Sequence, residues 1–313
     1  MTLVFIGASR FGLRCLQLAL QMPTVRVVGV VTAPQMFSIS YSPGGVKNFL
    51  HADVAAFCAE AAIPCVTLER SMKEDALSKA ISVWRPDAFL VVGWYHMIPE
   101  PWRAMAPAYG LHASLLPDYS GGAPLVWAMI NGETRTGITL FQMDDGVDSG
   151  PIVGQADEPI FDDDTIATLY GRIEEKGLEI LKIALPKIAA GTANFSIQDE
   201  SKRRVFPQRS PTDGLIDWQQ DASFIERFIR AQTRPYPGAY TTLNGERVTI
   251  WAAKRCLGVA GEAPGTVVHL GNEYRVSCGS GSILLRDLQY RGQEMGHLQL
   301  ADLFGSGGQQ LVG

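Results

Sequence analysis

The amino-terminal part of the chain alternates short apolar runs with stretches of helical spacing. Apolar runs occupy residues 3–6, 25–31, 64–67 and 88–92, and apolar residues recur at helical spacing in residues 11–20, 53–62 and 72–83. The run at 25–31 is β-branched and almost continuous, which is typical of a strand buried on both faces of a parallel sheet. This alternation predicts an α/β domain built on a doubly wound sheet.

The sequence pattern changes after about residue 205, where short runs typical of β-strands are separated by Gly and Asn. Expected strands are residues 240–243, 247–252, 265–270, 274–278 and 282–285, with a helix at 224–229 before them. A small β-barrel is the simplest closed arrangement of such strands. We therefore expect a first domain at residues 1–204, including a long linker helix at 164–190 that breaks at Gly177, and a barrel domain at 205–313. The basic stretch 201–204 is expected to be a connector, and residues 305–308 a flexible tail.

Length and composition exclude several classes of protein. A chain of 313 residues favours two domains, and 27 Lys plus Arg against 32 Asp plus Glu give a net charge of -5, unlike a protein that coats nucleic acid. The 5 cysteines contain no CxxC pair and the histidines have no ligand spacing, so we predict no disulfide framework and no metal. The chain shows no signal-peptide pattern and no long apolar run, which predicts a cytoplasmic protein without membrane association.

Residues 33–52 are expected to form a long loop between the second strand and the next helix. A loop of this length in a compact domain is usually functional or mobile. Its Phe37 and Tyr41 are aromatic side chains that could stack on a nucleotide base or anchor the loop to the domain.

A histidine and an aspartate carry the chemical signal. His112 closes one expected strand, and Asp148 follows the next strand 36 residues later. The ends of strands in an open α/β sheet converge at the ligand crevice, so we expect the two side chains to meet there. A His oriented by a carboxylate can donate a hydrogen bond or a proton to an oxygen that becomes negative in acyl transfer. Taken singly, a histidine is more often a structural residue, and an Asp-Ser-Gly stretch is common in plain turns.

The motifs around these two residues are more specific than the residues alone. They read His-Ala-Ser-Leu-Leu-Pro at 112–117, Gly-Ala-Pro at 122–124, Thr-Gly-Ile-Thr at 136–139 and Asp-Ser-Gly-Pro-Ile at 148–152. In this order they closely resemble the folate-dependent formyltransferase family. Residues 210–218 and 234–239 are similar to the carboxyl-terminal domain of its two-domain members, which include methionyl-tRNA formyltransferase and sugar N-formyltransferases. The resemblance covers nearly the whole chain.

The resemblance implies a Rossmann-like domain that holds 10-formyltetrahydrofolate as co-substrate, joined to a small OB-like barrel. The implied reaction passes a formyl group to a primary amine, with no metal. By similarity His112 stabilises the oxyanion, while Asp148 holds His112 and helps to remove the proton of the amine. The positions that the resemblance assigns to cofactor binding are Val92, Gly93, Trp94, Tyr95, Met97, Ile98, Leu111, Ser114, Asp144 and Val147.

The sequence departs from the family pattern at two positions. Gly110 stands where the family has its third catalytic residue, an Asn, and losing one oxyanion donor costs on the order of a hundredfold or more in rate. Ser120 stands where an Arg is usual, which predicts one positive charge fewer on the acceptor side. Gly110 leaves open a weakened formyltransferase, a rearranged site, a folate-binding protein without transfer, or a formyl-folate hydrolase.

Charge favours a small acceptor over tRNA. The tRNA enzyme carries a basic loop after its second strand, whereas residues 33–52 contain a single cation, Lys47, and residues 205–313 balance 10 Lys plus Arg against 10 Asp plus Glu. Phosphate contacts need a concentrated positive face. We therefore expect a small-molecule amine such as a nucleotide-linked amino sugar, with methionyl-tRNA as the alternative acceptor. The resemblance to sugar formyltransferases also suggests a homodimer.

Overall fold

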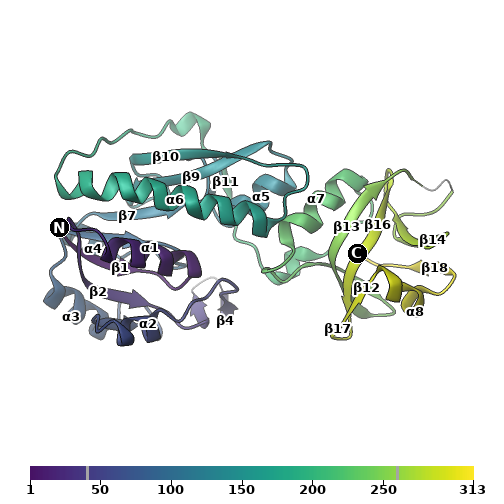
Figure 1. The fold of residues 1–313 in the computed structure, drawn as a ribbon, viewed down its shortest axis with the longest axis horizontal. Helices are drawn as coiled ribbons and strands as arrows, with labels where there is room; N and C mark the ends of the chain where they lie inside the picture. Colours follow the sequence, from purple (N-terminus) through teal and green to yellow (C-terminus); the bar gives the residue numbers. More distant parts are fainter. Residues whose placement is uncertain (40–41, 259–260) are drawn as a thin grey trace. The chain divides into compact units, whose positions relative to one another are not determined.

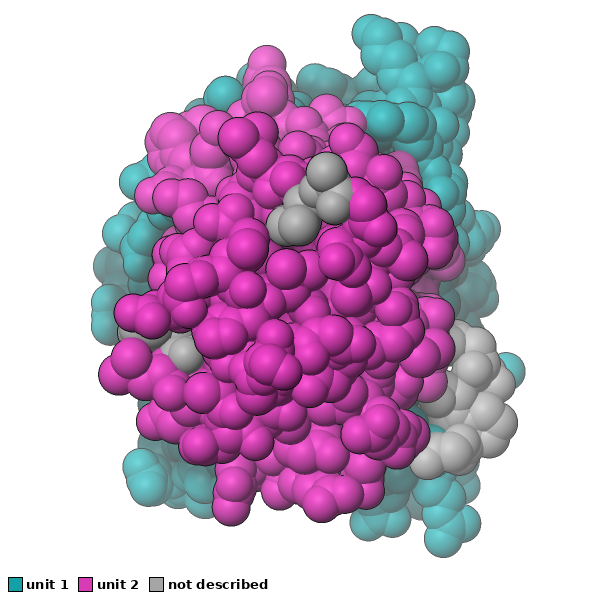
Figure 2. Space-filling model, turned by 90° about the vertical axis from the view of Figure 1, so that its right-hand side faces the viewer, with its two compact units in different colours: residues 1–121, 136–158, 171–205 teal, residues 122–135, 159–170, 206–313 magenta. Residues whose placement is uncertain are grey.

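The computed structural model describes residues 1–39, 42–258 and 261–313. These residues group into two units, which Figure 2 shows in different colours. The first unit comprises residues 1–121, 136–158 and 171–205, and the second comprises residues 122–135, 159–170 and 206–313. The expected division into two domains at residue 204 stays a prediction.

The first unit is built on a seven-stranded sheet with the order β10-β9-β7-β6-β1-β2-β5 (Figure 1). Its strands are β1 (Thr2–Ile6), β2 (Arg26–Thr32), β5 (Cys65–Thr67), β6 (Ala88–Val91), β7 (Ala108–His112), β9 (Arg135–Gln142) and β10 (Ile152–Pro159). The pairs β1–β2, β1–β6, β2–β5 and β6–β7 are parallel, and β7–β9 is antiparallel. The sheet order steps outward from β1 in both directions, and this confirms the doubly wound α/β prediction.

Helices cover both faces of this sheet. They are α1 (Arg10–Leu20), α2 (Val54–Glu60), α3 (Asp75–Trp84), α4 (Glu100–Met105) and α6 (Ile166–Ala189). Val4 and Ile6 share one buried cluster with Leu77 of α3 and Trp102 of α4. Side chains alternate across a strand, so the residues between them face the opposite side of the sheet.

The long helix α6 continues through Gly177, so the predicted break at this residue is wrong. A Cβ atom at Gly177 would lie 2.6 Å from Cζ of Phe11 in α1 and 2.9 Å from Cδ1 of Ile138. The glycine lets two elements approach closely instead of ending the helix. An ion pair of 2.9 Å between Arg14 and Glu174 joins the same two helices at the edge of this contact.

Two paired strands occupy residues 36–39 and 42–47, within the stretch 33–52 where a loop was expected. Strands β3 (Met36–Ile39) and β4 (Ser42–Lys47) pair antiparallel. Phe37 is buried, with its ring centroid 5.2 Å from that of Tyr95, so it anchors β3 to the unit. Tyr41 lies outside the described residues. The Ser-Pro-Gly-Gly composition of this stretch suggested a loop because such residues usually break strands.

Short segments follow the edge of the first sheet. The strand β8 (Ser120–Gly121) pairs with β11 (Val205–Phe206), and a 3₁₀ turn, η1, occupies Glu200–Lys202. The expected connector at 201–204 therefore has an ordered place beside Ser120, whose backbone N–H donates to the carbonyl of Arg204 at 3.0 Å.

The second unit is a curled antiparallel sheet of the order β12-β13-β16-β15-β14-β18, with β17 beside β16. Its elements are α5 (Pro124–Ile130), η2 (Pro211–Gly214), α7 (Ala222–Gln232), β12 (Ala239–Leu243), β13 (Glu246–Cys256), β14 (Thr266–Leu270), β15 (Glu273–Ser277), β16 (Ser282–Tyr290), β17 (Gln293–Gly296), η3 (His297–Gln299), α8 (Leu300–Phe304) and β18 (Gly307–Gln310). Two backbone hydrogen bonds between Thr242 of β12 and Val312 return the chain end to the first strand, which supports the predicted small barrel.

The carboxyl-terminal tail is part of this sheet, so the predicted flexible tail is wrong. Residues 307–310 form β18, in which Gln310 pairs with Thr266 and Gly307 with Val268. Gly307 and Gly308 both have positive φ, which glycine tolerates, so a glycine-rich segment bends into an edge strand here. No helix in the described residues is both long and apolar enough to cross a bilayer.

Candidate active site

His112 lies at the carboxyl end of β7, with both ring nitrogens near protein oxygens. Its Nε2 is 2.7 Å from the backbone oxygen of Tyr119, and its Nδ1 is 3.4 Å from Oδ2 of Asp148. A carbonyl oxygen only accepts hydrogen bonds, so Nε2 carries the hydrogen in this contact. Nδ1 is therefore the nitrogen that faces the carboxylate. The side chains of His112 and Asp148 are 11% and 20% exposed, so the pair remains reachable from solvent.

A returning loop, not a convergence of strand ends, brings Asp148 to His112. Because β9 runs antiparallel to β7, its last residue, Gln142, pairs with Tyr109, three residues before His112. The expectation that both strand ends meet at one edge is therefore wrong. His112 and Asp148 nevertheless lie close together, because residues 143–151 turn back toward His112.

The conformation of this loop depends on Asp144 and Asp148. Oδ1 of Asp144 accepts hydrogen bonds from the backbone of Gly146 at 3.0 Å and from Oγ of Ser149 at 2.6 Å. Asp148 has a φ of 52°, in the left-handed region, and its Oδ2 accepts the N–H of Gly121 at 2.8 Å. The resemblance assigns Asp144 to cofactor binding. In the structure its carboxylate stabilises this turn, and its cofactor role stays a prediction.

The stretch after His112 is held by buried polar contacts. Oγ of Ser114 donates to the carbonyl of Asp118 at 2.7 Å, and Oγ1 of Thr139 donates to the carbonyl of Ser114 at 2.7 Å. Nε2 of Gln155 donates to Oγ1 of Thr139 at 2.8 Å. Ser114 is fully buried, so its hydroxyl serves this turn, and its cofactor role stays a prediction. Leu111, in β7, is half-buried.

Gly110 leaves room that the side chain of Met143 partly fills. A Cβ atom at this position would lie 2.6 Å from Cε of Met143 and 3.2 Å from Cε1 of Phe141. Cε is the far end of a flexible side chain, so a larger residue at 110 requires a shift of this methyl group. The catalytic assignment of position 110 stays a prediction.

The segment after β6 carries an aromatic cluster. The ring of His96 lies 5.5 Å from those of Trp94 and Phe37, and the ring of Tyr95 lies 5.2 Å from that of Phe37. Nε1 of Trp94 and Nε2 of His96 are buried and have no hydrogen-bond partner within the described part of the chain. Burial lowers the pKa of His96. Buried polar atoms are normally satisfied, so two unpaired ones in one cluster mark a place that a ligand or water completes.

The other residues assigned to cofactor binding occupy different environments. Val92 is buried and extends β6 through its N–H, which donates to the carbonyl of Ile6 at 2.9 Å. Gly93 has a φ of 62° and lies directly against Ser9. Ile98 belongs to the apolar core, whereas Met97 is 60% exposed and Val147 is 51% exposed. Their cofactor contacts stay predictions.

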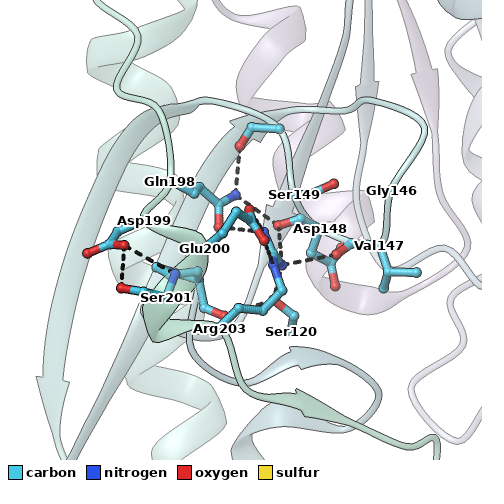
Figure 3. Close-up of polar contacts among 12 residues, drawn as sticks. Ser120, Gly146, Val147, Asp148, Ser149, Gln198, Asp199, Glu200, Ser201 and Arg203 are labelled. Atoms are coloured by element: carbon cyan, nitrogen blue, oxygen red, sulfur yellow. Dashed lines mark hydrogen bonds and ion pairs between the residues drawn. The ribbon is translucent and has the colours of Figure 1, made fainter.

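Two side chains that the motifs did not reveal complete the site. Gln198 and Arg203 both contact the Asp148 loop, and Nη1 of Arg203 donates to Oγ of Ser120 at 2.7 Å (Figure 3). Ser120 was expected to remove a positive charge, but the guanidinium of Arg203 lies beside its hydroxyl. In the sequence, the basic run at 201–204 could have pointed to Arg203. We interpreted this run as a connector, so its contact with Ser120 was not predicted.

A hollow of about 720 Å³ adjoins this region, lined in part by Pro117, Asp118, Lys202 and Arg204. Its cations are paired: Lys202 lies 3.2 Å from Asp199, and Arg204 lies 2.5 Å from Asp118. Arg203, which also lines the hollow, pairs with Glu200, so each of these cations has an acidic partner, unlike the unpaired cations that a polyphosphate backbone requires.

Family models cover most of the chain. Residues 2–185 match the model described as formyl transferase, and residues 209–301 match the one described as formyl transferase, C-terminal domain. The chain belongs to the formyl transferase family. The match confirms the resemblance drawn from the motifs.

Solved structures share the fold of this chain at low identity. The N-formyltransferase from Helicobacter canadensis, in complex with folinic acid and dTDP-3-aminofucose, is 18% identical over 92% of this chain and 98% of that one, with a TM-score of 0.64. Methionyl-tRNA formyltransferase from Clostridium thermocellum is 18% identical over 84% of this chain and 95% of that one, with a TM-score of 0.54.

Part of a longer protein has a similar fold. HypX from Aquifex aeolicus, in complex with tetrahydrofolic acid, is 18% identical over 96% of this chain, with a TM-score of 0.62. The chain spans 46% of that protein. At these identities the likeness shows the fold, and the acceptor has to be argued from the residues of this chain.

Proposed function

We propose that the protein transfers a formyl group from 10-formyltetrahydrofolate to the primary amine of a small molecule, such as a nucleotide-linked amino sugar. The observation that carries this proposal is the His112–Asp148 pair, 3.4 Å apart and accessible at the end of β7. A formyltransferase of the same fold from Helicobacter canadensis has a complex with folinic acid and a dTDP-linked amino sugar, which supports this class of reactants.

The aromatic cluster supports a folate site. 10-Formyltetrahydrofolate supplies the formyl group on its N10 nitrogen, and its planar pterin ring suits stacking against aromatic side chains. Nε1 of Trp94 and Nε2 of His96 provide buried, unpaired polar atoms in this cluster. The complex of HypX with tetrahydrofolic acid is consistent with such a ligand on this fold.

The polar contacts of the pair suggest how its members divide the work. Because Nε2 of His112 donates to the carbonyl of Tyr119, a second proton on the ring resides on Nδ1, on the side of Asp148. From there Nδ1 donates to the formyl oxygen as negative charge develops on it. The Asp148 carboxylate accepts a proton from the attacking amine, and the N–H of Gly121 holds this carboxylate in place. When the tetrahedral adduct collapses, the carbonyl forms again, the bond between the formyl carbon and N10 breaks, and the proton taken from the amine passes to N10, which leaves as tetrahydrofolate.

Charge supports a small acceptor over tRNA. The stretch 33–52 has Lys47 as its single Lys or Arg, and residues 205–313 carry equal numbers of acidic and basic side chains. Binding a tRNA through its phosphates needs several unpaired cations on one face. A nucleotide-linked sugar carries two phosphates and needs far fewer cations.

Mass spectrometry of the products tests the proposal. The protein is incubated with 10-formyltetrahydrofolate in parallel reactions containing nucleotide-linked amino sugars, methionyl initiator tRNA, or no amine. Formamide on an amino sugar is the expected result, absent from a matched Asp148→Asn variant. Formylation of tRNA alone would replace the acceptor, and folate turnover without amine would indicate a hydrolase. Folate binding without any turnover would contradict transfer and agree with a binding protein that lacks the Asn at 110.

A further inference from the structure

The segment between α6 and β11 contacts the backbone of the loop that carries Asp148. Gln198 is buried, and its Nε2 donates to the carbonyl oxygens of Asp148 at 2.8 Å and Gly150 at 2.6 Å (Figure 3). One amide group thus bridges two carbonyls on either side of Ser149. This contact fixes the direction of both peptide planes.

Arg203 adds a second set of donors to the same loop. Its Nη1 donates to Oγ of Ser120 at 2.7 Å and reaches the carbonyl oxygens of Val147 at 3.3 Å and Asp148 at 3.5 Å. Its Nη2 lies 3.4 Å from Oε1 of Gln198, which orients the amide with its NH₂ group toward the carbonyls. Figure 3 shows the guanidinium between Ser120 and the loop.

Glu200 sets the orientation of this guanidinium. Its two carboxylate oxygens accept from Nε of Arg203 at 2.6 Å and from Nη2 at 2.7 Å. The bond with Glu200, together with the charges of Asp148 and Asp144, raises the pKa of Arg203, so the donor fork stays complete. The side chain of Arg203 is 13% exposed and that of Glu200 is 64% exposed, so a surface carboxylate orients a largely buried guanidinium.

The loop needs such support because Asp148 has left-handed backbone geometry. At a φ of 52°, a residue with a Cβ atom adopts a conformation that is rarely populated unless its surroundings enforce it. Hydrogen bonds to the carbonyl of Asp148 enforce it from one side, and the bond from Gly121 to its carboxylate enforces it from the other.

We propose that Arg203, oriented by Glu200 and acting with Gln198, is a positioning residue that holds Asp148 in its reactive orientation toward His112. The inference rests on the proposed function. Arg203 acts through backbone carbonyls and Gln198, and the proton transfer itself belongs to His112 and Asp148. A lysine retains the charge but lacks the planar fork that reaches Glu200, Ser120 and the loop together.

The test compares Arg203→Ala with Lys202→Ala, a matched removal of one positive charge at the neighbouring position. Lys202 is 74% exposed and pairs with Asp199. A displaced catalytic group typically lowers the rate by about tenfold to a hundredfold. We expect this loss in kcat for Arg203→Ala with KM for the folate nearly unchanged, a similar loss for Arg203→Lys, and near wild-type values for Lys202→Ala. Added guanidinium should restore part of the Arg203→Ala activity and none of the Asp148→Asn activity.

Hydrogen–deuterium exchange separates this inference from the proposed function. Amides in residues 143–150 should exchange faster in Arg203→Ala than in wild type or Lys202→Ala, whether or not an acceptor is known. If the wild type transfers no formyl group, the proposed function fails, and unchanged exchange would then also overturn the role of Arg203. If the wild type is active, equal kcat in Arg203→Ala and Lys202→Ala overturns the inference.

Glu200→Gln keeps the inference testable if Arg203→Ala does not fold. This substitution is on the surface and removes the charge that orients the fork. A smaller decrease in kcat and faster exchange in residues 143–150 are expected. No change in either measurement would overturn the inference.

Discussion

The Asp148 loop and the segment at residues 92–98 differ in whether their polar atoms have hydrogen-bond partners. In the loop, the carbonyls of Asp148 and Gly150 accept hydrogen bonds from Gln198, and the carboxylate of Asp148 accepts one from Gly121. In the segment, Nε1 of Trp94 and Nε2 of His96 are buried without partners in the described residues. Satisfied atoms fix geometry before a ligand arrives, and unsatisfied ones leave binding energy for the ligand to recover.

The largest expected effect follows from removing the chemistry of the first region. Positioned acid–base groups contribute about 10²–10⁴-fold to the rate, so His112→Ala and Asp148→Asn should each lower kcat within this range. The two residues act as one unit, so the double variant should lose little more than either single variant. Steady-state kinetics with the identified acceptor measures this. Folate binding and melting temperature are the controls, and activity near that of wild type would remove the pair from the mechanism.

Gly110→Asn tests whether the site around His112 lacks one hydrogen-bond donor for the oxyanion. An amide two residues before His112 adds a fixed donor, and such a donor is worth on the order of a hundredfold in rate. Because the Cε of Met143 has to shift to admit the new Cβ, we expect a smaller gain, about tenfold in kcat. Gly110→Ala is the matched control, since it adds the same Cβ without the amide. A gain in both variants, or in neither, would contradict the donor explanation.

The Asp148 loop and the aromatic segment should differ in how much stability they lose when one polar group is removed. Gln198→Leu removes the donor of the buried Gly150 carbonyl and leaves the part-buried Asp148 carbonyl with the 3.5 Å contact to Arg203, so it should cost about 1–3 kcal/mol in the free energy of unfolding. Trp94→Phe removes an N–H that has no partner, so the unliganded protein should lose less than about 1 kcal/mol, mainly through the smaller ring.

Urea unfolding of both variants, with and without folate, measures this difference. The ligand should stabilise wild type more than Trp94→Phe, because the indole N–H then has a partner to lose. Equal stability losses in the two unliganded variants would erase the distinction between the regions.

The sequence could predict much of the fold because local patterns encode it. The β-branched run at 25–31 and the alternation around it predicted the parallel sheet, and the motifs at 112–117 and 148–152 led to the His112–Asp148 pair. Elements whose structure depends on distant partners escaped prediction. The edge strand Gly307–Gln310 has a glycine-rich sequence and is a strand because β14 pairs with it.

The same limit applies to the site. Arg203 and Gln198 reach the Asp148 loop from about fifty residues further along the chain, so no local motif contains them. The antiparallel course of β9 is also invisible in its sequence, and with it the need for a returning loop. Spacing therefore identified the chemical groups, whereas the residues that hold them in place required the fold.

The smallest expected effect concerns His96 and pH. Burial lowers the pKa of His96 in the folded protein below its ordinary value of about 6.5. As pH falls through and below that value, the unfolded chain takes up a proton more readily than the folded protein does, so the free energy of unfolding should fall. His96→Phe keeps an aromatic ring and removes this titration, whereas His269→Phe replaces an exposed histidine as a control. Urea unfolding between pH 7.5 and pH 5.5 should therefore show a shallower acid loss for His96→Phe than for wild type and His269→Phe, and parallel curves for all three would show that the aromatic cluster accepts a charged imidazole at no cost.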